Sequence, residues 1–468
     1  MLKSRDFMQA NLSASQTARA PIAILGVPFD NVNLAETLAL AGEMIASGQP
    51  HYATTVGVDF LAAALDDVEL RRILFDAHLV VAEEKAVVWA SKLLGNPLPD
   101  NVTVPNLLPQ LLAQAEKKNW RVFFLGHDAA MAGKIQARHP KLQLGSATVP
   151  PEKPLLEMDH ADILRRLREA KPEILLVAFG SPKQEKWINM NYREAGVPFV
   201  LGTGTTFDFL TGGRGAHKST IKSLWKFTRA VLRQWWQLRA RKKSAPPPAA
   251  APAVEPDPFG NFVIHAPEQL GAVEVKTFLA EWLRAVENSH VMFDLSGTVF
   301  MDSTGIGVLI RLRKRARERG HQFFLVAPRP PIEAALRQMK LDEFFTVQAS
   351  VAGARILMES VAHSPVVTSG VLEAELQIRW SGEVTALTAI DLGVHTESEL
   401  SQTSPGMTVV IDLSRVTFVD STGIGLMLRF KKNLRRRDIA LTFANPIESV
   451  RNVLRHTRLE EYLLAGTK

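Results

Sequence analysis

A sixteen-residue phrase that occurs twice sets the strongest constraint on the fold of this chain. Residues 292–307 read MFDLSGTVFMDSTGIG and residues 410–425 read VIDLSRVTFVDSTGIG, with ten identical positions at a constant offset of 118 residues (412 minus 294). A repeat of this kind indicates that the C-terminal half is a tandem of one module. The buried strands expected before the motif are 291–295 and 409–413, and the amphipathic helices expected after it are 304–319 and 422–437.

The Asp-Ser-Thr-Gly part of the phrase lies where the strand gives way to the helix. There Asp302 or Ser303 can cap the helix N-terminus, and Gly305 lets another backbone approach closely. The equivalent residues of the second copy are Asp420, Ser421 and Gly423. Capping alone explains one such site but not the extended match. A hydroxyl at this position is expected to be accessible, and a phosphate on it would bring about −1.5 to −2 charges to a docking surface.

Length and composition bound the rest of the chain. Its 468 residues suit about three domains of roughly 100–200 residues. The absence of cysteine excludes disulfides, thiolate metal sites and a cysteine nucleophile. No apolar run approaches the roughly 18 residues that span a bilayer, and the first residues lack a signal-peptide pattern. We therefore expect a cytosolic protein.

The segment upstream of the repeat alternates short apolar runs with helical stretches. This alternation predicts a Rossmann-like α/β domain with a mainly parallel sheet, whose ligands bind at the carboxyl ends of the strands. The strands expected are 78–81, 121–125, 174–179 and 199–201, and the helices expected are 34–47, 87–94, 107–118, 161–170 and 182–194.

The first of two polar strand ends in this domain follows residues 174–179. The strand ends at Gly180, where the lack of a side chain admits a ligand, and Ser181 then caps a helix with a proline in its first turn. The N–H groups of such a helix start attract phosphate oxygens, and Lys183 adds a positive charge. Gln184 and Glu185 can hydrogen-bond sugar or ribose hydroxyls.

The second strand end reads GTGTTFDFLTG over residues 202–212. Gly202, Gly204 and the hydroxyls between them can form another anion-accepting turn, with Asp208 nearby. A purely structural turn is the plainer interpretation of this segment taken alone.

A basic segment closes the upstream domain. No acidic residue lies between Asp208 and Glu255, and ten basic residues fall in this stretch. Five of them, from Lys218 to Arg233, follow one face of a helix, opposite tryptophans and aliphatic residues. This pattern predicts a helix in an anionic membrane interface, and the alternative is a core-packed helix with a solvated basic face. Nucleic acid is not an expected partner, because no nucleic-acid-binding fold accompanies the patch. The residues expected at the membrane or at a lipid diphosphate are Arg214, Lys218, Lys222, Lys226, Arg229 and Arg233.

Composition also indicates boundaries. Residues 1–20 are polar and unpatterned, which is typical of a loose tail. Prolines amid alanines in 244–258 predict a stiff linker, and 351–370 is a second join. The expected domains are 21–240 for the upstream domain, 259–350 for the first copy of the module and 371–468 for the second.

The doubled phrase, with Asp-Leu-Ser before Asp-Ser-Thr-Gly-Ile-Gly, resembles the STAS domain of anti-sigma factor antagonists and anion-transporter tails. In antagonists of that family a partner kinase phosphorylates the serine that follows the aspartate. The resemblance therefore implies phosphorylation at Ser303 and Ser421. It also implies a partner such as an anti-sigma factor, a serine kinase or another STAS-binding protein. Docking without phosphorylation is the alternative.

The upstream segments together resemble the WecG/TagA/CpsF family of bacterial glycosyltransferases over residues 21–240. Further matches are VVWA at 87–90, LLG at 93–95 and VFFLG at 122–126. The resemblance implies transfer of an N-acetylated aminosugar from a UDP-sugar to a polyprenyl-diphosphate-linked sugar, in the synthesis of a cell-surface polysaccharide. It implies a location at the inner face of the cell membrane, with no bound metal and no cofactor. It also assigns the basic segment to the membrane and the lipid diphosphate.

The chain departs from the family pattern in three loops on the base and acceptor side. The family's Thr-x-Asn is Thr55-Val56-Gly57, its Pro-Asp-Gly is Ala82-Glu83-Glu84, and its Gly-x-Asp-Leu is Val104-Pro-Asn-Leu107. Glu83 retains a carboxylate that reaches one methylene further and is the expected base, while Thr55 would hold a sugar or phosphate. With the nucleotide-side helix intact, the pattern favours retained sugar-nucleotide binding and altered or lost transfer.

Three functions are consistent with these features. The leading one is a divergent glycosyltransferase, peripheral to the membrane, with two STAS modules as a regulatory or docking tail. The alternative is a degenerate transferase that senses a nucleotide sugar or lipid intermediate and signals through phosphorylated STAS modules. A more remote third is an anti-sigma antagonist whose upstream domain only tethers it to the membrane.

Overall fold

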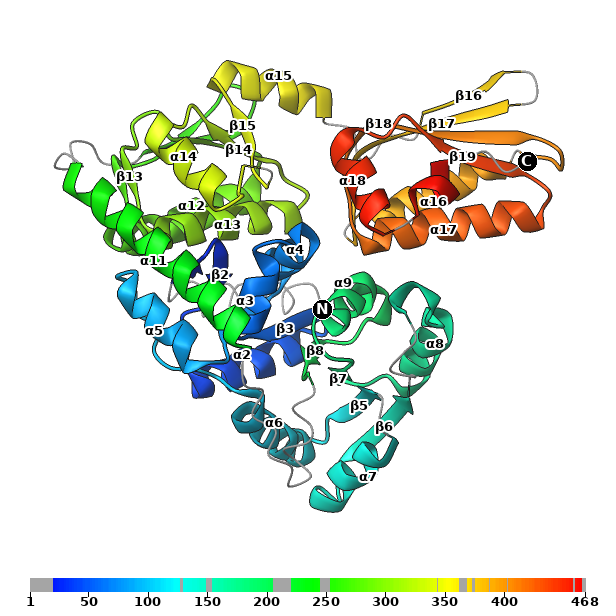
Figure 1. The fold of residues 1–468 in the computed structure, drawn as a ribbon, viewed down its shortest axis with the longest axis horizontal. Coiled ribbons are helices and arrows are strands. Elements are labelled where there is room, and N and C mark those ends of the chain that lie inside the picture. The colour runs from blue at the N-terminus through cyan, green and yellow to red at the C-terminus, as the bar shows by residue number, and fades with distance from the viewer. Residues whose placement is uncertain are drawn as a thin grey trace. The chain divides into compact units, whose positions relative to one another are not determined.

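The computed structural model describes residues 20–126, 129–148, 154–204, 220–244, 253–342, 344–361, 368–372, 375–386, 388–401, 403–457 and 459–464. The chain divides into two compact units. One contains nearly all of the N-terminal domain (20–244) and the first module (253–359), and the other contains the second module (368–464). Figure 1 labels their elements. The predicted loose tail, up to residue 19, lies outside the described residues.

The N-terminal domain is built on a six-stranded parallel sheet in the order β4-β3-β8-β7-β5-β6. Its strands are β3 (His51–Val56), β4 (Leu79–Ala82), β5 (Arg121–Gly126), β6 (Gln143–Thr148), β7 (Ile174–Ala178) and β8 (Phe199–Gly202). The predicted α/β fold class is confirmed, and the four predicted strands are present. The sequence missed β3 and β6, because β3 mixes polar with apolar residues and β6 is a mostly exposed edge strand.

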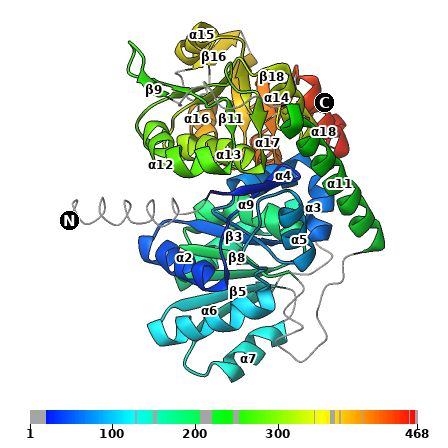
Figure 2. The same cartoon turned by 90° about the vertical axis from the view of Figure 1, so that its left-hand side faces the viewer.

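Helices cover both faces of this sheet. The predicted helices correspond to α2 (Leu34–Ser47), α5 (Lys85–Leu93), α6 (Val104–Lys118), α8 (His160–Ala170) and α9 (Lys183–Ala195). Helices α3 (Val58–Ala64), α4 (Val68–Asp76), α7 (Ala129–Arg138) and the short η1 (Leu155–Glu157) were not predicted. Helices α2 and α6 share a core with the strands beneath them. Helix α11 (Ile221–Ser244) lies against α3 (Figure 2).

A short hairpin precedes the sheet. Strands β1 (Ile22–Ile24) and β2 (Val27–Phe29) pair antiparallel around Leu25 and Gly26, whose φ angles are 53° and 81°. Positive φ at both turn residues is the geometry that matches the twist of a two-residue hairpin. The N–H of Leu25 donates to the buried Gln234 Oε1 of α11 at 3.0 Å. Three-residue strands give too weak a pattern for prediction from sequence.

The first module has a five-stranded sheet in the order β15-β14-β12-β10-β9, in which only the edge pair β9–β10 is antiparallel. The strands of the sheet are β9 (Ala253–Pro256), β10 (Phe262–His265), β12 (Val291–Asp294), β14 (Phe323–Val326) and β15 (Thr346–Gln348). Two further strands, β11 (Gln269–Leu270) and β13 (Phe300–Met301), form a separate parallel pair. Its helices are α12 (Ala272–Asn288), α13 (Ser303–Glu318), α14 (Pro330–Gln338) and α15 (Val351–Val361). The apolar residues of α12–α14 form one core, and α15 packs in a second cluster.

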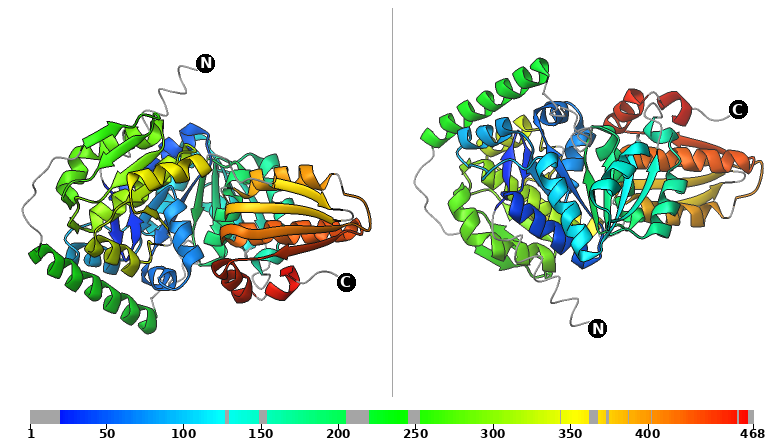
Figure 3. Two further views of the ribbon diagram at one scale, coloured as in Figure 1. Left: turned by 90° about the horizontal axis from the view of Figure 1, so that it is seen from above. Right: turned by 90° about the horizontal axis from the view of Figure 1, so that it is seen from below.

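The second module repeats this plan with a four-stranded sheet in the order β16-β17-β18-β19 (Figure 3). Its strands are β16 (Thr368–Leu372), β17 (Glu375–Val384), β18 (Thr408–Val419) and β19 (Ala440–Ala444). Its helices are α16 (Ala389–Leu400), α17 (Ser421–Arg436), α18 (Glu448–His456) and α19 (Glu460–Leu464), all of which share a single core with the sheet.

Two predicted joins contain regular structure. Residues 253–256 of the expected proline linker form β9, whose Pro256 is tolerated because the strand lies at a sheet edge. Helix α11 ends at Ser244, and residues 245–252 lie outside the described part. In the expected join 351–370, residues 351–361 form α15, where Ala354 and Met358 are buried against the sheet.

Candidate active site

Four strand ends bring the predicted site residues together. Strands β4, β3, β8 and β7 are neighbours in a parallel sheet, so their carboxyl ends meet at one edge. Thr55 lies near the end of β3, Glu83 follows β4, and Gly202 ends β8. Gln184 and Glu185 lie in the first turn of α9, just after β7. The residues assigned to the base and to the donor therefore share one edge.

On the base side, Thr55 and Glu83 are in contact. The Thr55 hydroxyl donates to Glu83 Oε2 at 3.2 Å. The backbone of Glu83 is held as well, since its N–H donates to the Val56 carbonyl at 3.0 Å and its carbonyl accepts from the Asn101 amide at 2.9 Å. Glu83 is half-buried. Its carboxylate is thus positioned on a fixed backbone while keeping access to solvent.

On the donor side, Gln184 links the two polar strand ends. Its Nε2 donates to Glu185 Oε1 at 2.6 Å, and its Oε1 accepts from the Gly204 N–H at 2.9 Å. Gln184 and Glu185 are both buried. A Cβ atom on Gly202 would lie 2.9 Å from Gln184 Nε2, so this glycine makes room for the glutamine side chain.

Glu185 has the chemistry of a functional carboxyl group. Burial raises the pKa of Glu185 to about 7, and the charge of Glu83 acts in the same direction, against hydrogen bonds from Gln184 and Ser181. Its Oε2 has no hydrogen-bond partner among the described residues. A buried carboxyl that titrates near neutral pH suits proton transfer or binding of a sugar hydroxyl, and such groups gather at active sites.

The start of α9 differs from the prediction. The helix begins at Lys183 with Pro182 as its N-cap residue and no side-chain cap, whereas Ser181 was expected to cap it with Pro182 in the first turn. The Ser181 hydroxyl instead hydrogen-bonds to Glu185. Gly180 has a φ of 76°, and Lys183 Nζ lies 5.7 Å from the Phe179 ring centroid.

Glu84 is a residue whose role the sequence did not reveal. Glu84 Oε1 accepts from the N–H of Val58 at 3.0 Å and so caps α3, whose N-cap residue Gly57 has no side chain. A Cβ atom on Gly57 would lie 2.4 Å from that same oxygen. Two departures from the family pattern, at 57 and 84, therefore fit one another. Neither this pair nor the Asn101 contact has a local sequence signal, because both depend on the sheet bringing distant loops together.

Helix α11 packs with one face and exposes another. Phe227, Val231 and Gln234 are buried. The large apolar residues on the exposed face are Ile221, Leu224, Trp225, Leu232 and Trp236. The two tryptophans are 65% and 67% exposed, which is unusual for side chains of this size. The predicted apolar face is thus mostly exposed, whereas a core-packed helix would bury it.

The predicted basic face is only partly exposed. Lys226 belongs to the packed side, since its Nζ lies 2.6 Å from Asp66 Oδ2 and donates to the Ala62 carbonyl at 2.6 Å. The predicted residues that are exposed are Lys222, Arg229 and Arg233. Asp208, Arg214 and Lys218 lie outside the described residues. Across the described ranges, no helix is long and apolar enough to cross a bilayer. In the same ranges, no group of three His, Asp or Glu side chains is placed to hold a metal ion.

Both repeated motifs cap their helices through the aspartate. Asp302 Oδ1 accepts from the N–H groups of Thr304 and Gly305 at 2.7 and 3.0 Å, and Asp420 does the same in the second module. A Cβ atom on Gly305 would lie 2.2 Å from a backbone carbonyl, which confirms the close approach. The expectation of an accessible hydroxyl is wrong for Ser303, which is 0% exposed, while Ser421 is partly exposed.

Comparison with known proteins agrees with this architecture. Residues 22–239 match the glycosyl transferase WecG/TagA/CpsF family, and residues 252–354 and 366–467 each match the STAS domain. The N-acetylglucosaminyldiphosphoundecaprenol N-acetyl-beta-D-mannosaminyltransferase of Staphylococcus aureus (strain NCTC 8325 / PS 47) is 23% identical over 236 residues, which is 48% of this chain and 90% of the relative. The protein of the same name from strain MRSA252 matches to the same extent.

Among solved structures, an anti-sigma-factor antagonist (STAS) domain protein from Planctomyces limnophilus is 24% identical. The match covers 24% of this chain and 99% of that protein, with a TM-score of 0.22. The family matches carry the assignment: this chain consists of a WecG/TagA/CpsF-family glycosyltransferase domain followed by two STAS domains.

The pKa of Glu185 predicts a pH-dependent stability. Because that pKa is raised to about 7 from 4.5, the folded protein binds this proton more tightly than the unfolded chain, and stability falls as pH rises through that window. Glu185→Gln keeps the acceptor for Gln184 but cannot ionise. We expect it to flatten the slope and to be more stable than the parent at about pH 8, by on the order of 1–3 kcal/mol in urea unfolding. An unchanged slope would contradict the assignment.

The contact between Gly57 and Glu84 predicts how two substitutions change the free energy of unfolding. Glu84→Ala should lower the free energy of unfolding by about 1 kcal/mol, because α3 loses its cap. Adding Gly57→Asn in that background should restore most of the loss, since asparagine is a favourable N-cap residue and the carboxylate no longer blocks it. Chemical denaturation of the three proteins tests this. A double variant no more stable than Glu84→Ala would argue against the pairing.

Proposed function

We propose that the N-terminal domain transfers an N-acetylated aminosugar from a UDP-sugar to a polyprenyl-diphosphate-linked acceptor in cell-surface polysaccharide synthesis. The observation that carries this proposal is the meeting of Thr55, Glu83 and the Gln184–Glu185 pair at one sheet edge. The named activity of the S. aureus relatives, an N-acetylmannosaminyl transfer to N-acetylglucosaminyldiphosphoundecaprenol, supports the same chemistry.

In the proposed reaction, Glu83 acts as the general base. An acceptor hydroxyl oxygen attacks the anomeric carbon of the donor, and the hydroxyl proton passes to the Glu83 carboxylate. The bond from the anomeric carbon to the diphosphate oxygen breaks, and its electron pair leaves with UDP. Thr55 holds one carboxylate oxygen by its hydrogen bond, which limits the freedom that the extra methylene of glutamate introduces.

The donor is proposed to lie against the first turn of α9. The helix N-terminus has no side-chain cap, so its partial positive charge and the Lys183 ammonium are suited to the leaving diphosphate. Glu185 Oε2, which has no other partner in the described chain, is proposed to bind a hydroxyl or amide group of the sugar. If the domain binds UDP-sugar but forms no product, it is a sensor, which is the second candidate function.

Membrane attachment is proposed to occur through the exposed face of α11, at the inner face of the cell membrane. Arg229 lies 5.4 Å from the Trp225 ring centroid and Arg239 lies 4.3 Å from that of Trp235. Tryptophans flanked by arginines are suited to the polar–apolar boundary of an anionic bilayer. This placement would bring the sheet edge to a lipid-linked acceptor without a membrane-spanning segment.

The base assignment is tested with two adjacent glutamates. Glu83→Gln should lower kcat by about 10²- to 10⁴-fold, because amide cannot accept the proton. Glu84→Gln keeps an oxygen for the α3 cap and should retain activity near that of the parent. The assay uses UDP-N-acetylhexosamines with a polyprenyl-diphosphate-linked N-acetylglucosamine, and donor binding is measured in parallel. Equal turnover of the Glu83→Gln variant and the parent would remove Glu83 from this role.

The membrane assignment is tested with vesicles containing anionic lipid. Replacing both Trp225 and Trp236 with alanine should weaken binding at least about 10-fold, because two interfacial anchors are lost. Trp89→Ala is the matched control, since Trp89 is 58% exposed but lies on α5. Arg229→Ala with Arg233→Ala should weaken binding mainly at low salt. Equal effects of the α11 and Trp89 substitutions would refute the assignment.

A further inference from the structure

The motif face of the first module is engaged by the N-terminal domain within the same compact unit. The Ser303 hydroxyl accepts a hydrogen bond from the Asn96 amide at 2.8 Å, and Asn96 also bonds to Asp302. Asn96 lies in the loop after α5 of the N-terminal domain. One side chain of that domain therefore contacts both the cap and the serine of the motif.

The hairpin β1–β2 makes the second contact. A Cβ atom on Gly307 of α13 would lie 2.4 Å from the Pro21 carbonyl oxygen, so only glycine permits this approach. At the other end of the hairpin, a Cβ atom on Gly26 would lie 3.1 Å from the Met339 carbonyl oxygen of the first module. At both glycines the backbones of the two parts approach closely, with no side chain between them.

Apolar packing is continuous across this contact. Ala23 and Phe75 of the N-terminal domain belong to the same buried cluster as the core of the first module. The Phe75 and Phe344 ring centroids are 4.2 Å apart. Burying one such phenylalanine contributes about 1.5–3 kcal/mol. The two parts therefore share a core and do not merely touch.

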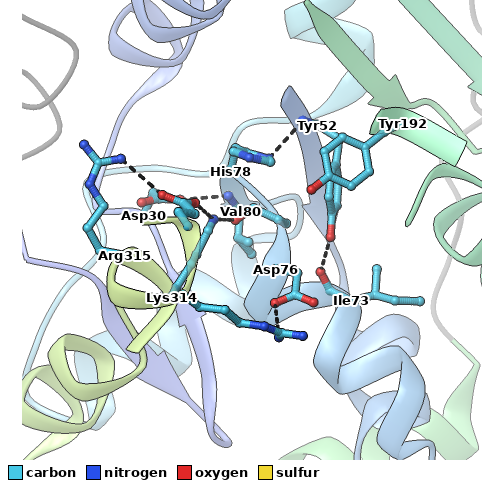
Figure 4. Close-up of polar contacts among 12 residues, drawn as sticks. Asp30, Tyr52, Ile73, Asp76, His78, Val80, Tyr192, Lys314 and Arg315 are labelled. Carbon is cyan, nitrogen blue, oxygen red and sulfur yellow. Dashed lines mark hydrogen bonds and ion pairs between the residues drawn. The ribbon is translucent and has the colours of Figure 1, made fainter. Parts of the chain in front are cut away.

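Basic residues of α13 complete the interface. Lys314 donates to the Ala77 carbonyl, and Arg317 pairs with Asp76 at 3.5 Å. Figure 4 shows Lys314 of α13 close to Asp30, with Asp76 on the same side of the helix. Burial raises the pKa of Asp30, while the charges of Arg311 and Lys314 act to lower it. Cations on one side thus meet carboxylates and carbonyl oxygens on the other.

The second module carries the same motif with a more exposed serine. Its Asp420 caps α17 with the same geometry, yet Ser421 is partly exposed. The residues of α17 that correspond to Arg311, Lys314 and Arg317 are Arg429, Lys432 and Arg435, and all three are exposed. The contact that distinguishes Ser303 is the one with Asn96 of the N-terminal domain.

We propose that the first module is a docked part of the transferase domain, held by the face that carries Ser303, and that Ser303 is shielded from a protein partner to a greater degree than Ser421. The partner of the first motif face is the N-terminal domain of the same chain. A kinase or an anti-sigma factor must displace the hairpin and Asn96 before it reaches Ser303. The two modules therefore differ in the accessibility of their motif serines despite the common motif.

The lack of cysteine in the chain allows a direct test. Ser303→Cys and Ser421→Cys each introduce a single thiol of nearly the same size as the hydroxyl. In the folded full-length protein, a maleimide should modify the thiol at 303 at least about 100-fold more slowly than the thiol at 421, because reaction at 303 requires local opening. In denaturant the two rates should be equal. Equal rates in the folded protein would overturn the proposal.

A charge-reversal series shows whether docking causes the protection. Arg317→Asp in the Ser303→Cys protein should speed modification by about 10-fold or more, because it places like charges at Asp76. Adding Asp76→Arg should slow the reaction again. The matched control is Arg435→Asp in the Ser421→Cys protein, which should change little. Protection at 303 that is insensitive to Arg317→Asp would overturn the proposal. If Ser303→Cys fails to fold, hydrogen exchange of the β1–β2 hairpin is measured in its place. Exchange should be slow in the parent and faster in Arg317→Asp, and equal rates in the two proteins would overturn the proposal.

Discussion

The interface between the N-terminal domain and the first module is the interaction on which the larger compact unit depends. It combines the backbone approach of the β1–β2 hairpin at Gly307, apolar packing of Phe75 of α4, and the contact of Lys314 with the Ala77 carbonyl. Each component alone contributes a modest free energy to the interface, and surface ion pairs in particular contribute little. Their combination makes the first module an extension of the transferase core. In sequence the first module looks like an appended regulatory domain, but in the structure it shares a buried core with the transferase domain.

The same contact is connected to the proposed active site through strand β4. The N–H of Asp30, just after β2, donates to the Val80 carbonyl at 2.8 Å, and the Asp30 carboxylate accepts from the Val80 N–H at 2.8 Å. Strand β4 then leads directly to Glu83. The segment beyond Glu83 reaches Asn96, which contacts Ser303, and Asn101, which holds the Glu83 carbonyl. The segment that carries the proposed base is thus fixed at both ends by residues of the docking region.

Much of the architecture could be predicted from the sequence. Apolar runs located β4, β5, β7 and β8, and a parallel sheet puts the residues that follow β4 and β7, Glu83 and the Gln184–Glu185 pair, at the same edge. Thr55 was singled out only by the family resemblance, because β3 was not predicted. The cap role of Asp302 and the close approach at Gly305 also followed from local patterns. What the sequence could not reveal depends on contacts between distant segments. The burial of Ser303 by Asn96, the fit of Glu84 over Gly57 and the packing of Lys226 on Asp66 all arise only once separate elements have docked.

The central claim, that the transferase domain and the first module form one cooperative unit, is tested most directly by hydrogen exchange of the full chain at increasing denaturant. Peptides from β1–β2, from β4 and from α13 should open with one common free energy and one common denaturant dependence. Peptides from the second module, such as those of α17, should follow a separate transition. Opening of α13 at lower denaturant than β4 would show that the first module unfolds by itself and would contradict the account.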